Sequence, residues 1–153
     1  MATMSMRDAL GDQAAAFEGL SVEQCQAVVD AMILVLYAEG GASDEQADVF
    51  STTLSELPSL SALGNEGRAQ LTQRAIDKLT QLDPSAFTAH LASIARALNR
   101  PAAAPSLLAI AAAVACVGGE LGETRVRLLG LLGTALGVDG DDLAAAVQRL
   151  VGN

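Results

Sequence analysis

Apolar residues recur along much of the chain at intervals of three and four, the spacing that places side chains on one face of an α-helix. Two segments show this spacing most clearly, residues 66–82 and residues 84–100. Their inward positions are Leu71, Ala75, Ile76, Leu79 and Leu82 in the first segment, and Phe87, Leu91, Ile94, Ala95 and Leu98 in the second. The pattern predicts two helices that each bury one face.

Three helix starts can be identified from their first residues. Ser21–Gln24 and Ser43–Gln46 both have the form Ser-x-x-Gln. This is a capping box, in which the serine oxygen accepts an N–H of the first turn and the glutamine accepts the serine N–H. Asp83 followed by Pro84 is a further start, because aspartate caps free N–H groups and proline fits the first helical position.

Glycine and proline mark where the predicted helices end. The first long helix is expected to run to Gly40 and the second to stop before Pro58, which leaves residues 58–65 as an irregular connector. We expect seven or eight helices, depending on whether residues 1–20 contribute one near 5–18; the others cover 22–39, 44–57, 66–82, 84–100, 105–117, 121–136 and 139–151.

Composition agrees with an all-α fold. Alanine and leucine dominate, and both favour helices over sheets. Aromatic residues are few, namely Phe17, Tyr37, Phe50 and Phe87. A length of 153 residues suits one domain with a sizeable core. We therefore expect residues 1–153 to form a single domain, a compact bundle of close-packed helices.

Charge is unevenly distributed along the chain. Residues 8–66 contain eleven Asp and Glu residues and no Lys or Arg, and the formal net charge is −9. Such a chain does not suit nucleic acid or an anionic membrane face, because both require Lys and Arg to replace counterions. Its long-range attraction is for cations or for a protein partner with a basic surface. The alternative is that these acids only keep the protein soluble.

Location is suggested by the cysteines and the amino-terminal residues. Cys25 and Cys116 lie in apolar stretches without metal-ligand spacing, so we expect two buried free thiols in a reducing compartment. Asp8 and Asp12 stand where a secretion signal needs a hydrophobic centre, which predicts a cytoplasmic protein. The charge-free run 101–119 is rich in alanine and interrupted by proline, so it predicts a core helix and no membrane span.

The chain resembles itself at a shift of 79 residues. This shift places Gly40 on Gly119 and Asp44 on Glu123, so that "VLYAEGGASDEQADVF" falls on "VACVGGELGETRVRLL". Both segments consist of an apolar helix, a glycine break, a short acidic link and a second apolar helix. We expect two pseudo-repeated helical hairpins packed about a pseudo-twofold axis, an arrangement that brings the two acidic links together.

At these links the sequence resembles the TerB-like family of tellurite-resistance-associated helical proteins. "AEGGASDEQ" is similar to the family signature of a helix end, Asp, Gly and later acids, with a second copy at "VGGELGETR"; the later "LLGTALGVDGDDLAAAV" is similar to the family's closing pattern. The resemblance covers roughly residues 20–150. It implies a compact helical domain in a stress- or tellurite-resistance-related assembly, with acids at both links that bind a divalent metal.

Carried over to this chain, the resemblance assigns five acids to a metal site for Ca²⁺ or Mg²⁺. The signature Asp falls on Glu39 in the first copy but on Gly118 in the second, which therefore lacks a carboxylate. Hard cations take about six to eight oxygen ligands, so both links must meet to supply them. The candidate ligands are Glu39, Asp44, Glu45, Glu120 and Glu123.

The alternative for three of these acids is ordinary helix chemistry. Asp44, Glu45 and Glu123 lie in first turns, where the helix dipole favours an anion by about 0.3–1 kcal/mol. Glu39 differs, because the dipole disfavours a carboxylate at a carboxyl end. We expect it to have a partner, which is either a metal ion or an arginine.

No set of catalytic residues is recognisable. His90 is the only histidine, and no Ser/His/Asp or Cys/His set accompanies it. The preferred function is a non-enzymatic binding module with an acidic face for a divalent cation or a basic protein partner. The alternative is a helical scaffold without a metal site, with residues 107–117 as the seam of a homodimer; a small hydrolase is the third possibility.

Overall fold

The computed structural model describes residues 15–38, 41–100, 102–117 and 122–141. Every regular element within these ranges is helical, which confirms the all-α class. Six α-helices and two short 3₁₀ turns follow one another in the order α2 (Val22–Leu36), α3 (Asp44–Glu56), η2 (Ser61–Leu63), α4 (Gly64–Thr80), η3 (Pro84–Ala86), α5 (Phe87–Leu98), α6 (Ala104–Ala115) and α7 (Glu123–Leu136).

The helix count differs from the expected seven or eight, since the described part of the chain has six α-helices. The helices expected near 5–18 and over 139–151 fall mostly outside it. Several boundaries also differ. The connector expected to be irregular over 58–65 contains η2, and α4 begins within it at Gly64. The first long helix ends at Leu36, before the expected Gly40, and the turn after Asp83 is 3₁₀, so that α5 begins only at Phe87.

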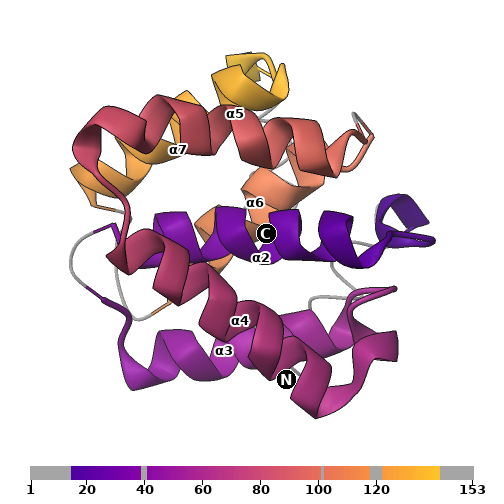
Figure 1. Ribbon diagram of the computed structural model, residues 1–153. Helices are drawn as coiled ribbons and strands as arrows, with labels where there is room; N and C mark the ends of the chain where they lie inside the picture. Colours follow the sequence, from indigo (N-terminus) through magenta and orange to yellow (C-terminus); the bar gives the residue numbers. More distant parts are fainter. Residues whose placement is uncertain (1–14, 39–40, 101, 118–121, 142–153) are drawn as a thin grey trace.

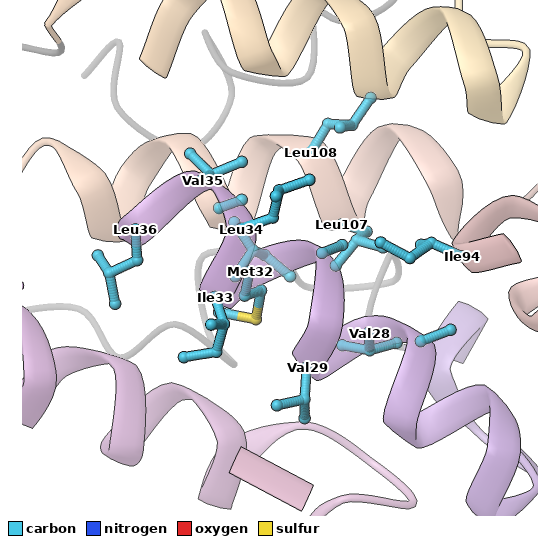
Figure 2. Packing of buried hydrophobic residues seen from close by; sticks show 14 of the residues in the cluster. Val28, Val29, Met32, Ile33, Leu34, Val35, Leu36, Ile94, Leu107 and Leu108 are labelled. Atoms are coloured by element: carbon cyan, nitrogen blue, oxygen red, sulfur yellow. The ribbon is translucent and has the colours of Figure 1, made fainter. Parts of the chain in front are cut away.

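Helix α2 forms the centre of the bundle (Figure 1). Helices α5 and α7 lie on one side of it, α3 and α4 lie on the other, and α6 packs along its length. All residues from Ala27 to Leu36 are buried, as expected for a helix that other helices surround. Figure 2 shows Val29 and Ile33 projecting to one side of α2, whereas Leu107 and Leu108 lie on the other.

Helix α6 is the second buried helix, and it corresponds to the charge-free run of the sequence. Leu107, Leu108 and Ile110 are each 0 % exposed. Its alanines allow close approach to α2 and α7. The burial of α6 confirms the predicted core helix. Other helices of the same chain therefore cover most of the residues that the sequence offered as a dimer seam. Among the residues described, no helix combines the length and the apolar character needed to cross a membrane.

Both predicted capping boxes are present, and each glutamine has a second role. Ser21 and Ser43 accept N–H groups of Gln24 and Gln46, and both glutamine Oε1 atoms accept the serine N–H. The amide of Gln24 also donates to Leu98 O at 2.8 Å, and the amide of Gln46 donates to Ala115 O at 2.9 Å. Each glutamine therefore completes the start of one helix and the end of another.

Candidate functional site

The predicted metal ligands that the structure describes are exposed residues at helix starts. Asp44 and Glu45 occupy the first turn of α3, and Glu123 occupies the first turn of α7. Glu39 and Glu120 lie outside the described residues. The described ranges contain no group of three or more His, Cys, Asp or Glu side chains that could hold a metal ion. The five-residue site therefore stays a prediction.

Glu123 has only a weak ionic contact. Its Oε1 atom lies 3.9 Å from Arg127 Nη2, one helical turn along α7, and the two side chains are 92 % and 72 % exposed. Pairs of this kind stabilise a helix by about 0.3–0.5 kcal/mol. The carboxylate is thus close to fully solvated, as the dipole interpretation of first-turn acids requires.

The first turns of α3 and α7 contact the last residues of α6 and α2 through long-range bonds that the sequence did not reveal. Gln46 Nε2 at the start of α3 donates to Ala115 O at the end of α6. Arg125 Nη2 at the start of α7 donates to Leu36 O at the end of α2 at 2.6 Å, and to Gly41 O at 3.3 Å. The described residues that flank the two links therefore lie next to each other.

Arg125 places a positive charge at this junction. Its side chain is 7 % exposed, and its Nε donates to Val35 O at 3.3 Å. The carboxyl end of a helix carries partial negative charge and unpaired carbonyl groups. The guanidinium donates to these carbonyls of α2 and opposes their partial negative charge.

A second polar cluster lies among α2, α4 and α5, around a buried carboxylate. Asp30 is 7 % exposed, although its neighbours in α2 are apolar. Its Oδ2 accepts from Lys78 Nζ at 2.9 Å, and its Oδ1 accepts from Gln26 Nε2 at 2.9 Å. The Gln26 amide also donates to Leu71 O, and its buried Oε1 has no hydrogen-bond partner among the described residues. A cavity of about 420 Å³ adjoins these residues and is also lined by Glu23 and Arg74.

His90 on α5 is influenced by the same cluster. Burial lowers the pKa of His90 below its usual value of 6.5, while the Asp30 carboxylate raises this pKa and Lys78 lowers it. The neutral imidazole is the favoured form because partial burial penalises the charged one. Among the described residues, no hydrogen bond joins the imidazole to a nucleophile or to a carboxylate.

Asp30 and Arg125 are the polar residues that sequence reasoning missed. Asp30 is the one charge within the apolar stretch "AVVDAMILVL", whereas Arg125 lies between Glu123 and Arg127 in "ETRVR", where charged residues are ordinary. A charge at a position where helical periodicity requires burial is the signal that identifies the first of them. No comparable signal marks Arg125, because its burial depends on the end of α2.

No family model, no curated protein and no solved structure matches this chain.

Proposed function

We propose that this chain is a non-enzymatic, TerB-like binding module of the cytoplasm, and that its partner is a protein with a basic surface that contacts the outer face of α3. The observation that carries the proposal is the exposure of Asp44, Glu45 and Asp48 on this helix. Residues 44 and 48 lie one turn apart, so the carboxylates form one patch. The resemblance to the family supports a role in a stress- or tellurite-resistance-related assembly.

The charge of the surrounding sequence supports this partner. Helix α3 contains no lysine or arginine, and none occurs elsewhere between residues 8 and 66. A surface of one sign attracts the opposite sign during encounter and sets which partner is accepted. Helix α3 also lies at the outside of the bundle, at the bottom of Figure 1. A basic surface can therefore reach it without rearrangement of the core.

A basic protein is favoured over a divalent cation as the partner. Asp44, Glu45 and Asp48 are exposed residues in the first two turns of α3, whereas Ca²⁺ needs about six to eight converging oxygen atoms. Arg125 also supplies positive charge where the two links begin. Ca²⁺ or Mg²⁺ bound by Glu39, Asp44, Glu45, Glu120 and Glu123 is the second candidate, which the same experiment tests.

We also propose that α2–α3 and α6–α7 are a pseudo-repeat. With the shift of 79 residues, the last residue of α2, Leu36, falls on the last residue of α6, Ala115. The first residue of α3, Asp44, falls on the first residue of α7, Glu123. The coincidence of helix ends supports a common origin for the two hairpins. A helical structural or oligomeric scaffold with no metal site is the remaining alternative.

The test is binding of a short lysine-rich peptide, measured by calorimetry at two salt concentrations. We expect binding that weakens with salt, and a loss of about tenfold or more in affinity when Asp44→Asn, Glu45→Gln and Asp48→Asn are combined. The matched control removes three exposed acids elsewhere, Glu66→Gln, Asp77→Asn and Asp141→Asn. This control changes the net charge of the protein by the same amount as the triple variant of α3.

The outcomes separate the candidates. Equal loss of peptide binding in both triple variants shows a general charge effect and contradicts a site on α3. Titration of the wild type with Ca²⁺ and Mg²⁺, repeated with Glu39→Gln, tests the cation: heat that disappears in the variant would establish the metal site instead. Absence of binding to both peptide and ions leaves the scaffold alternative as the better explanation.

A further inference from the structure

A cavity of about 380 Å³ lies between α2, α3 and α4. Its most deeply buried lining residues are large and apolar: Ile33, Leu36, Phe50 and Leu54 are each at most 5 % exposed. Figure 2 shows Ile33 on the side of α2 away from Leu108, which is the side where α3 and α4 lie. Small-molecule sites are typically apolar cavities of about 300–1,000 Å³ with few polar groups, and this cavity falls within that range.

The cavity exists because small residues face each other across it. Helix α3 presents Ala47 and Ser51, one turn apart, and α4 presents Ala69 and Thr72. Protein interiors are normally close-packed, and larger side chains at these positions would fill the gap. Ala47, Ser51 and Ala69 are exposed, so the cavity is open to solvent on this side.

Arg68 is the one charged residue among those that line the cavity. Its Nη1 donates to Leu60 O at 3.2 Å and to Ser61 O at 3.1 Å, and its Nη2 donates to Asn65 Oδ1 at 2.6 Å. These bonds hold the guanidinium in place. A guanidinium has five N–H donors, so a hydrogen on Nε and one on Nη2 have no acceptor among the described residues.

This arrangement selects the chemistry of a ligand. Two adjacent N–H groups of an arginine match the two oxygens of a carboxylate, and such charge-assisted pairs are stronger than neutral ones. No acidic residue lines the cavity, although the chain as a whole has a net charge of −9. The cavity is therefore a local exception to the negative charge around it.

We infer that this cavity binds a small molecule with an apolar body and a single carboxylate. The apolar body lies on Ile33, Leu36, Phe50 and Leu54, and the carboxylate pairs with Arg68. None of the three acids in the proposed patch lines this cavity, so the inference does not depend on the proposed function.

The fluorescence of a tyrosine that lines the cavity can be used to measure binding. Tyr37 lines the cavity and is the chain's only tyrosine, and the chain has no tryptophan. Tyrosine fluorescence therefore follows binding without a label. The probes are decanoate, decanol and decylamine, which share one apolar chain and differ in head group. We expect the wild type to bind decanoate about tenfold more tightly than decanol and to bind decylamine least.

Variants of the cavity test both halves of the inference. Arg68→Gln removes the charge and should abolish the preference for decanoate while decanol still binds. Arg68→Lys keeps the charge but loses the paired donors, so its preference for decanoate over decanol should lie between those of the wild type and Arg68→Gln. Ser51→Leu combined with Ala69→Leu fills the cavity and should abolish binding of all three probes. Ala92→Leu adds the same side chain to an exposed position of α5 and should change nothing.

Four binding outcomes overturn the inference, and a fifth outcome comes from light scattering. These are no binding of decanoate to the wild type, equal binding of decanoate and decanol, an equal loss of both in Arg68→Gln, and undiminished binding in the filled variant. Light scattering is measured in parallel. If the wild type is a dimer that dissociates when the cavity is filled, the occupant is a second copy of the chain and the ligand assignment is wrong.

Discussion

Gln46 and Arg125 make equivalent bonds, one from α3 to α6 and the other from α7 to α2. Each is the third residue of its helix, and each donates to the last residue of the helix it contacts: Gln46 Nε2 to Ala115 O at 2.9 Å, and Arg125 Nη2 to Leu36 O at 2.6 Å. Helix ends leave such carbonyl groups unpaired. These reciprocal bonds satisfy them in a buried location, where an unmet carbonyl would cost about 1–3 kcal/mol.

Gln46→Glu tests the first of these bonds with little change in shape. The carboxylate can still accept the Ser43 N–H, but it has no hydrogen for Ala115 O, which it then faces in a buried position. We expect the free energy of unfolding to fall by about 1–3 kcal/mol at neutral pH. The loss should shrink at acidic pH, because a protonated carboxyl group can donate again.

Urea denaturation at several pH values measures this effect. Gln24→Glu is the matched control, since it occupies the same position in the first capping box and donates to Leu98 O from a less buried location. It should destabilise less. Equal stability of Gln46→Glu and the wild type at neutral pH would show that the bond to Ala115 contributes nothing.

Arg125 and Arg127 provide a comparison between a buried and an exposed arginine on one helix. Arg125 is 7 % exposed and donates to carbonyls at the end of α2, whereas Arg127 is 72 % exposed and lies 3.9 Å from Glu123. We expect Arg125→Gln to lower the free energy of unfolding by about 1.5–3 kcal/mol, the range for hydrogen bonds of charged groups. Arg127→Gln should change it by less than about 0.5 kcal/mol.

Thermal and urea unfolding of the two variants check this prediction. The substitution is the same and removes the same charge, so net charge cannot explain a difference. Glutamine at position 125 also reproduces the residue found at position 46. Retention of most of the stability by Arg125→Gln would mean that one amide donor suffices at both junctions.

The helix starts could be predicted from sequence because their determinants are local. Ser21 and Gln24, like Ser43 and Gln46, bond to each other within one turn. The α-helix after Asp83 begins later than the sequence predicts. Asp83 does cap an N–H, that of Ser85, but the turn it begins is 3₁₀. A capping residue thus indicates that a turn begins, and later packing decides its type.

The buried polar groups could not be predicted in the same way, because their partners are far away in sequence. Asp30 meets Lys78 across 48 residues, and Arg125 meets Leu36 across 89. The residues next to Asp30 or Arg125 in the sequence do not indicate which distant residue each of them contacts. The metal prediction relied on acids in links instead, and the acids that the structure describes there are solvated first-turn residues.

His90 predicts a specific dependence of stability on pH. Its pKa in the folded state is lowered below 6.5, chiefly by burial. The folded state therefore binds fewer protons than the unfolded state between these two pKa values. The resulting stability is fully present above pH 6.5 and decreases as the pH falls from 6.5 through the lowered pKa. His90→Asn should remove this part of the decrease.

The neighbours of His90 give the sign of two further changes. Because the chain has one histidine, its imidazole resonances can be followed by NMR without assignment. Asp30 raises the pKa of His90 and Lys78 lowers it. Asp30→Asn should therefore lower the titration midpoint, and Lys78→Met should raise it. A shift of both midpoints in the same direction would show that conformational change, and not charge, dominates the response.

Cys25 and Cys116 should differ in their reaction with a thiol reagent. Cys25 is 1 % exposed, and burial raises the pKa of its thiol, so both access and the thiolate fraction are reduced. Cys116 follows the last residue of α6 and is only partly buried, which departs from the expectation of two buried thiols.

Ellman's reagent measures this difference directly. In the native protein we expect a fast phase that disappears in Cys116→Ser and persists in Cys25→Ser, followed by a slow phase with the opposite behaviour. Both thiols should react quickly in urea, which shows that the slow phase comes from the fold. Cys25 is a residue of α2 and lies in the hydrophobic core, so its reaction requires the core to open. Equal native rates for the two thiols would mean that α2 is not held as tightly as its burial implies.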